Sequence, residues 1–274
     1  MSTAILSRNN FETGTHLESK FGHMVAGVGI RKKAYLISTL SLMFWAVIGW
    51  GGVMLGIFPA DPTDDYAGAT TFFAMWMALF AFLDNPGENR TLIQKLEEFI
   101  FVWLISSGLA QIFWELPFVL IKTTYLYPLG QVLSHEDSWL WPFWLYASGD
   151  TRYMSPHEAS HATETLLAIS GFFEILAAYY IKTGKKYKTG LIMAALLHWG
   201  FMWANNSVIY LGEIYAGFKN IEDGMAGFWI KWLGMNMQWS VLSPLCTFSA
   251  LYLLMKKSEE EGVSKYLNQN QKPL

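Results

Sequence analysis

The chain has 274 residues, of which 53% are hydrophobic, 16% aromatic and only 15% charged, with a formal net charge of −3. A typical soluble domain carries about 25% charged residues, so this composition indicates a membrane protein. The small negative charge argues against nucleic acid as a partner. The single cysteine excludes an internal disulfide and a cysteine-rich metal site.

Apolar runs recur along the chain at the length that crosses a bilayer. A hydrocarbon core of about 30 Å needs about 20 apolar residues in a helix. The sequence therefore predicts an all-α fold, a polytopic membrane helix bundle of about six transmembrane helices. The predicted spans are residues 34–58, 67–83, 99–121, 163–181, 191–211 and 228–255.

Basic residues gather in alternate loops, which predicts an orientation. Arg31, Lys32 and Lys33 precede the first span, whereas the loops at 61–66 and 222–225 are acidic or poor in basic residues. The positive-inside rule then places both termini in the cytoplasm, and in a eukaryote we expect the endoplasmic reticulum membrane. The expected organisation is a cytoplasmic N-terminal segment (1–33), a helical bundle (34–257) and a cytoplasmic polar tail (258–274).

Several predicted spans contain polar residues, which are costly there. A charged side chain at the bilayer centre costs about 2.5–3.5 kcal/mol, so it usually faces a protein interior and has a function. Gln111 and Glu115 are four residues apart and share a helix face. Glu164, Glu174 and His198 follow in later spans. We expect a functional, lipid-accessible cavity; the alternative is hydrogen bonding between helices.

Residues 157–161 fit the zinc-binding pattern H-E-x-x-H, in which two histidines share a helix face. The pattern is short and stands at the mouth of a predicted span. We therefore expect a polar helix start there and no catalytic metal.

Residues 146–153, YASGDTRY, are followed eleven residues later by Glu164. Together they resemble the emopamil-binding protein family, also called the EXPERA domain, which includes sterol Δ8–Δ7 isomerase and the sigma-2 receptor. ELPFVL at 115–120 and MNMQW at 235–239 resemble two further stretches of that family. The resemblance implies a five-helix core at about 67–255, with one additional N-terminal helix.

The resemblance also implies a chemistry. Such isomerases shift a sterol double bond by protonation and deprotonation through a carbocation. Matched by position, Glu115 and Glu164 form the acid–base pair, Asn236 orients polar groups, and Trp239 offers a π face to the cation. Asp150 and Arg152 resemble a structural ion pair.

The expected substrate is a sterol or related isoprenoid lipid in the membrane, without a cofactor, and cationic amphiphilic amines are expected inhibitors. The substrate-binding residues are predicted to be Gln111, Trp114, Asn206 and Tyr210. Gln111 stands where the family isomerases have a histidine that helps proton transfer. A terpenoid cyclase using the same acid chemistry, or a non-catalytic sterol-binding protein like the sigma-2 receptor, therefore stays open as an alternative.

Overall fold

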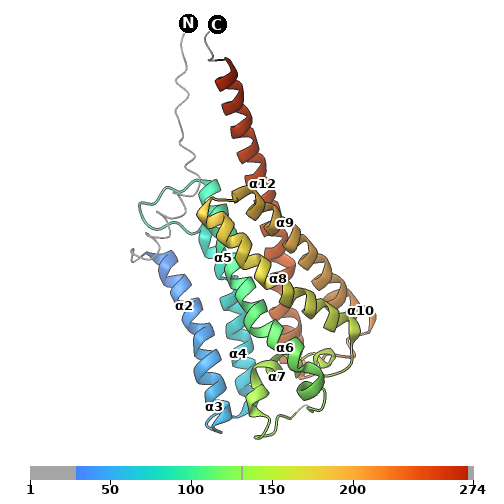
Figure 1. Ribbon diagram of the computed structural model, residues 1–274. Helices are drawn as coiled ribbons and strands as arrows, with labels where there is room; N and C mark the ends of the chain where they lie inside the picture. Colours follow the sequence, from blue (N-terminus) through green and yellow to red (C-terminus); the bar gives the residue numbers. More distant parts are fainter. Residues whose placement is uncertain (1–28, 131, 271–274) are drawn as a thin grey trace.

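The computed structural model describes residues 29–130 and 132–270. Within this part of the chain the regular structure is entirely helical, and the one antiparallel bridge, between Asp150 and Ile221, is isolated. The helices lie side by side in an elongated bundle (Figure 1). The all-α fold expected from the sequence is confirmed.

The first half of the bundle alternates α-helical, π-helical and 3-10 segments. The segments up to residue 126 are α2 (Ile30–Phe44), η1 (Trp45–Gly49), α3 (Trp50–Met54), α4 (Ala60–Met75), η2 (Trp76–Phe82), α5 (Leu92–Ala110), η3 (Gln111–Glu115), α6 (Leu116–Ile121) and η4 (Lys122–Leu126).

The second half begins with short segments and ends in the longest helix. These segments are η5 (Ser138–Leu140), α7 (Trp141–Ala147), η6 (Thr151–Tyr153), α8 (Glu158–Thr183), α9 (Tyr187–Ala204), η7 (Asn205–Leu211), α10 (Gly212–Tyr215), α11 (Gly224–Ala226), η8 (Gly227–Gly234) and α12 (Met235–Asn270). The C-terminal part of α12 projects beyond the bundle, at the end where α2 begins (Figure 1).

Four continuous helical stretches are long and apolar enough to cross a membrane: Ile30–Met54, Leu92–Leu126, Glu158–Thr183 and Gly224–Tyr266. Three of them contain a predicted span, 99–121, 163–181 or 228–255, and the fourth, Ile30–Met54, overlaps the predicted span 34–58 but ends four residues earlier. The remaining two, at 67–83 and 191–211, are helical but are not among these four. The total of six therefore stays a prediction, as do the orientation of the termini and the host membrane.

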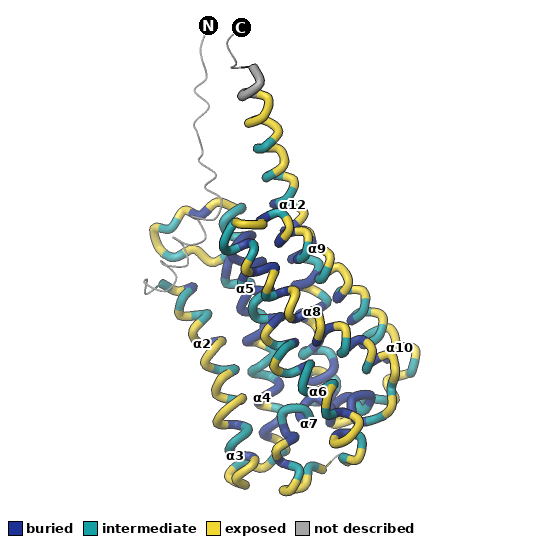
Figure 2. The backbone as a smooth tube through the Cα atoms, in the orientation of Figure 1, coloured by how far each residue is buried: buried dark blue, intermediate teal, exposed yellow. Residues whose placement is uncertain are grey.

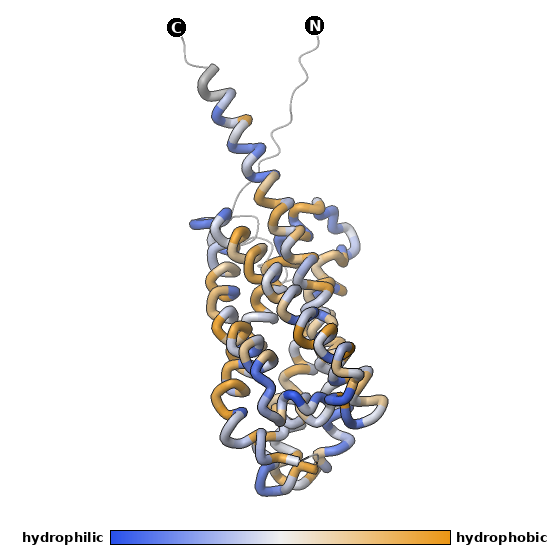
Figure 3. Tube along the Cα trace, turned by 90° about the vertical axis from the view of Figure 1, so that its right-hand side faces the viewer, coloured by the Kyte–Doolittle hydropathy of each residue, from blue (hydrophilic) through white to orange (hydrophobic). Residues whose placement is uncertain are grey.

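The outer face of the bundle is rich in exposed apolar side chains. Ile37 on α2, Phe172 on α8 and Trp203 on α9 are each more than half exposed. Hydrophobic stretches reach the outer surface of the bundle, whereas the projecting end of α12 is hydrophilic (Figure 3). Apolar surface of this extent would be a liability in water and suits contact with lipid.

Capping residues in the sequence determine where helices α5 and α8 begin. Thr91 caps α5 in a capping box, in which its hydroxyl accepts from the Gln94 backbone N–H and the Gln94 side chain accepts from the Thr91 N–H. His157 caps α8, and Gly184 ends that helix with a left-handed φ of 68°. These boundaries set where Glu115 and Glu164 fall along their helices.

Buried residues lie on the inner side of the helices (Figure 2), and the buried hydrophobic residues form two clusters. One joins α5, α8, α9 and α12 and includes Phe99, Trp103 and Cys246. The other gathers around α7 and η6 and includes Phe118, Tyr153 and Trp232. The polar residues described next lie within and between these two clusters.

Candidate functional site

Two buried glutamates from different helices meet inside the bundle. Glu115 ends η3 and is 8% exposed, and Glu164 lies in the second turn of α8 and is 3% exposed. The two carboxyl groups interact through a hydrogen bond and electrostatically. One oxygen of each, Oε2, is buried and receives no hydrogen bond from another residue, so the two carboxyl groups depend on each other for a partner.

A chain of hydrogen bonds leads to Glu164 from the loop before α8. The Tyr153 hydroxyl donates to Glu164 Oε1. The Tyr146 hydroxyl interacts with Tyr153, and their rings meet edge to face at 4.4 Å. Asn236 Nδ2 in turn donates to the Tyr146 hydroxyl at 2.5 Å. Each donor in this chain therefore points toward the carboxyl pair.

Burial keeps both tyrosines protonated. It raises the pKa of Tyr153 and of Tyr146 well above the ordinary value for a phenol, and nearby carboxylates add to the effect. Both hydroxyls therefore remain hydrogen-bond donors at every pH at which the protein functions.

A buried lysine stands beside the same loop. Lys122 is fully buried, and its ammonium donates to the Arg152 backbone carbonyl at 3.2 Å. The ammonium also lies over the rings of Phe118, Tyr127 and Tyr153 at 5.4–5.6 Å. It interacts electrostatically with Glu164. One positive charge is thus held near the carboxyl pair.

Asp150 and Arg152 pair with each other and hold the loop against η7. Arg152 Nη2 lies 2.5 Å from Asp150 Oδ2, and Nη1 donates to the Val208 carbonyl at 2.9 Å. Burial raises the pKa of Asp150, although the hydrogen bond and positive charge of Arg152 oppose the shift. The pair therefore positions the loop that carries Tyr153.

The predicted substrate-binding residues do not gather in one place. Trp114 stacks on Phe118 at 5.3 Å and meets Tyr146 edge to face at 5.7 Å, so it borders the carboxyl site. Asn206 accepts a hydrogen bond from a serine of α12. The Tyr210 hydroxyl donates to the Leu233 carbonyl, which links η7 to η8.

Two other predicted site residues lie in the other cluster. The Trp239 ring packs against Trp103 at 5.3 Å and Phe201 at 6.2 Å. Gln111 Nε2 donates to Glu174 Oε1 at 2.7 Å. Trp239 therefore packs with Trp103 and Phe201, and Gln111 is hydrogen-bonded to Glu174.

The H-E-x-x-H stretch has a local role in the structure. His157 is not inside the helix but is its N-cap, with an extended backbone. Its Nδ1 accepts from the Ser160 backbone N–H at 3.2 Å. One of the two ring nitrogens of His157 is thus used in capping α8.

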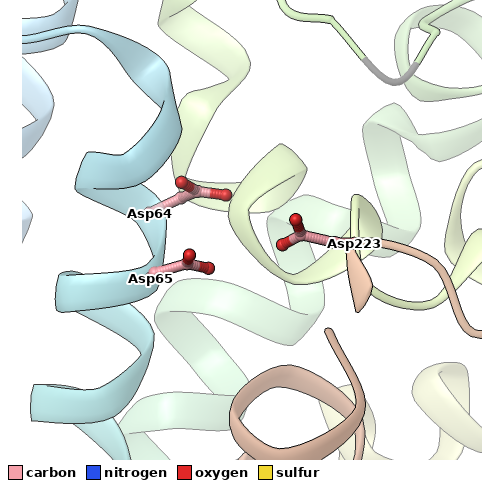
Figure 4. A group of neighbouring side chains, drawn as sticks. All are labelled: Asp64, Asp65 and Asp223. Atoms are coloured by element: carbon pink, nitrogen blue, oxygen red, sulfur yellow. The ribbon is translucent and has the colours of Figure 1, made fainter. Parts of the chain in front are cut away.

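Three aspartates form an acidic cluster, with ligand atoms within 4.8 Å of one another. Asp64 and Asp65 on α4 face Asp223 across a gap (Figure 4). Lys231 neutralises part of this negative charge. Its Nζ lies 2.6 Å from Asp64 and 3.3 Å from Asp65, and it also contacts Asp223. An ammonium at this place stands in for the cation that the carboxylates would otherwise attract.

Sequence reasoning missed three residues of the carboxyl site. Tyr146 and Tyr153 stand at the two ends of YASGDTRY, and Lys122 follows a predicted span. The sequence offered two signals for these residues: a tyrosine at each end of a polar loop, and a lysine at the end of a predicted span. Only the tertiary structure shows that all three converge on Glu164.

A scan against protein-family models and a search of the curated proteins each found no match to this chain. The fold and the site define an all-helical protein with membrane-spanning helices and a buried pair of carboxyl groups.

Proposed function

We propose that the protein is a membrane isomerase that shifts a double bond in a sterol or related isoprenoid by protonation and deprotonation. The observation that supports this most is the buried Glu115–Glu164 pair, because two carboxyl groups from different helices interact there away from water. Two carboxyl groups in contact in a dry site share a proton and divide the roles of acid and base.

The roles follow from the neighbours of each carboxyl. Tyr153 donates to Glu164, and the Lys122 ammonium interacts with it, so both favour a carboxylate there. Among residues 29–130 and 132–270, no cation interacts with Glu115 in the same way. We therefore assign the shared proton, and the acid role, to Glu115, and the base role to Glu164.

The reaction then balances without a redox partner. Glu115 gives its proton to one alkene carbon, whose π electrons form the new C–H bond and leave a cation on the other carbon. Glu164 removes a proton from a neighbouring carbon, and that C–H electron pair becomes the new double bond. The proton count of the substrate is unchanged, and proton transfer between the carboxyl groups restores the starting state.

Aromatic rings next to the pair suit the cation. Trp114, Phe118, Tyr146 and Tyr153 form consecutive ring contacts at 4.4–5.7 Å. A ring face stabilises a cation by about 2 kcal/mol or more when water is excluded. In this proposal these rings take the part that the resemblance gives to Trp239.

Incubation of the purified protein with candidate lipids in heavy water tests the proposal. Double-bond migration is the expected result, and each product gains a deuterium whenever the shared carboxyl proton has exchanged with the solvent before the turnover. Ring formation would replace the isomerase by a terpenoid cyclase, and binding without any product would leave a lipid-binding protein. Cationic amphiphilic amines, as mimics of the carbocation, are expected to inhibit migration.

A further inference from the structure

A second group of buried polar residues lies away from the carboxyl pair. Gln111 on η3, Glu174 on α8 and His198 on α9 are all fully buried. Three of their atoms, Gln111 Oε1, Glu174 Oε2 and His198 Nε2, have no hydrogen-bond partner. Unpaired buried polar atoms are costly, so three at one place indicate a site for a polar ligand group.

The hydrogen-bonding character of two of these atoms is fixed by their neighbours. Trp103 Nε1 is 3.2 Å from His198 Nδ1, and an indole nitrogen can only donate. His198 Nδ1 is therefore an acceptor, and the proton of the neutral ring is on Nε2. Glu174 Oε1 already accepts from Gln111, and Oε2 has no partner, so Oε2 is an acceptor when the carboxyl group is ionised. One unpaired donor thus faces one unpaired acceptor.

The spacing of donor and acceptor selects a chemical group. His198 Nε2 and Glu174 Oε2 are 3.9 Å apart, too far for a direct hydrogen bond. An oxygen at about 2.8 Å from each would bond both with an angle of about 90° at the oxygen. A hydroxyl satisfies both atoms, because it donates to the carboxyl oxygen and accepts from the imidazole N–H.

We infer that Glu174 and His198, supported by Gln111, bind the hydroxyl group of a lipid alcohol. This inference rests on the proposed function and deepens it, since it assigns the polar end of the substrate to a defined place. Trp103 and Trp239 pack beside His198 and Phe201, so aromatic walls adjoin the polar group.

The two sites lie within reach of one lipid molecule. Gln111 and Glu115 are four residues apart on η3, about 6 Å along a helix, and Glu164 and Glu174 are ten apart on α8, about 15 Å. A sterol or a long isoprenoid alcohol is long enough to place its hydroxyl at one site and an alkene at the other.

The test compares alcohols with carbonyl compounds of the same shape in direct binding to the full-length protein. Cholestanol is paired with cholestanone, and geranylgeraniol with its aldehyde. The carbonyl compounds accept from His198 but cannot donate to Glu174. We expect at least tenfold tighter binding of the alcohol in one pair, and the pair that shows it distinguishes a sterol from an open-chain isoprenoid.

Glu174→Gln sharpens the test with little change in volume. The amide oxygen keeps the bond from Gln111, so the amide NH2 replaces the free acceptor, and the site then holds two donors. The preference for the alcohol should disappear in this variant. Thr247→Val, a buried substitution on α12, is the control and should keep the preference. Retained binding of the carbonyl compound shows that each variant is folded.

Equal affinities for alcohol and carbonyl in both pairs would overturn the inference. The unpaired atoms would then be explained by a buried water molecule. A preference that survives Glu174→Gln would overturn it as well. The proposed function fails separately: alcohol preference without double-bond migration contradicts the isomerase only, and migration without alcohol preference contradicts this inference only.

Discussion

The Tyr153 hydroxyl donates a hydrogen bond to Glu164, although the two residues belong to different elements, η6 and α8. Tyr153 is 2% exposed and lies between Phe118 and Tyr146. The loop that carries Tyr153 is itself fixed by the Asp150–Arg152 ion pair. One side of the carboxyl pair is therefore held by a rigid neutral donor.

Tyr153→Phe removes that donor and keeps the ring. A hydrogen bond to a charged group is worth about 1.5–3 kcal/mol, so turnover should fall roughly 10- to 100-fold. Steady-state rates in the lipid assay, with thermal unfolding measured in parallel, check this. Tyr125→Phe, at a half-exposed ring, is the matched control and should retain full activity. Unchanged turnover in Tyr153→Phe would remove Tyr153 from the site.

Lys231→Met should strongly destabilise the fold. The ammonium is fully buried and contacts Asp64, Asp65 and Asp223, so its loss leaves like charges unpaired. Breaking a buried ion pair by removing one partner costs about 3–5 kcal/mol. Thermal unfolding in detergent should show a large decrease for Lys231→Met and little change for the exposed Lys219→Met. Similar unfolding temperatures for the two variants would contradict the structural role.

The Arg31–Glu88 ion pair predicts an acid-sensitive end of the bundle. Arg31 Nη1 lies 2.6 Å from Glu88 Oε2, and its hydrogen bonds lower the pKa of Glu88 from 4.5 to about 2. A lowered carboxyl pKa stabilises the folded state above the unfolded value. This stability is fully present above pH 4.5 and is lost as the pH falls toward 2.

Glu88→Gln should therefore lose less stability over that acid range than the wild type does, when unfolding temperatures are compared across pH. Glu136→Gln, in an exposed loop, is the control and should follow the wild type. A Glu88→Gln curve parallel to the wild type would show that the pair does not contribute.

Glycosylation mapping tests the predicted orientation. Asn89, Arg90 and Thr91 form a sequon, and Asn89 is exposed. The predicted topology puts it in the cytoplasm, so it should stay unmodified in a eukaryotic host. Val132→Asn creates a second sequon with Ser134 at a site that is 87% exposed, on the opposite side, and this one should be modified. A glycan on Asn89 alone would invert the orientation.

The sequence predicts the helices better than it predicts what they bring together. Long apolar runs are enough to place the helices, because length and apolarity decide membrane insertion. The juxtaposition of Glu115 and Glu164 follows only from the family resemblance. Trp239 shows the limit: nothing in the sequence indicates that its ring packs on Trp103.

The reason is rotation about the helix axes, which the sequence does not display. Gln111 and Glu115 lie in a π-helical turn, whose i→i+5 hydrogen bonds put more residues in each turn and so change which way each side chain points. Gln111 consequently contacts Glu174, while Glu115 contacts Glu164. The contacts of Lys231 with Asp64 and Asp65 likewise depend on a helix, α4, that is distant in sequence.

The central claim is tested most directly by deuterium incorporation in heavy water with Glu115→Gln, Glu164→Gln and the double variant. Glutamine keeps the shape and most hydrogen bonding but carries no transferable carboxyl proton. The account predicts that each single variant loses about a hundredfold or more in turnover while lipid binding persists. The double variant should be little worse, because the two carboxyl groups act as a unit. A Glu164→Gln protein that still incorporates deuterium at the wild-type rate would contradict the account.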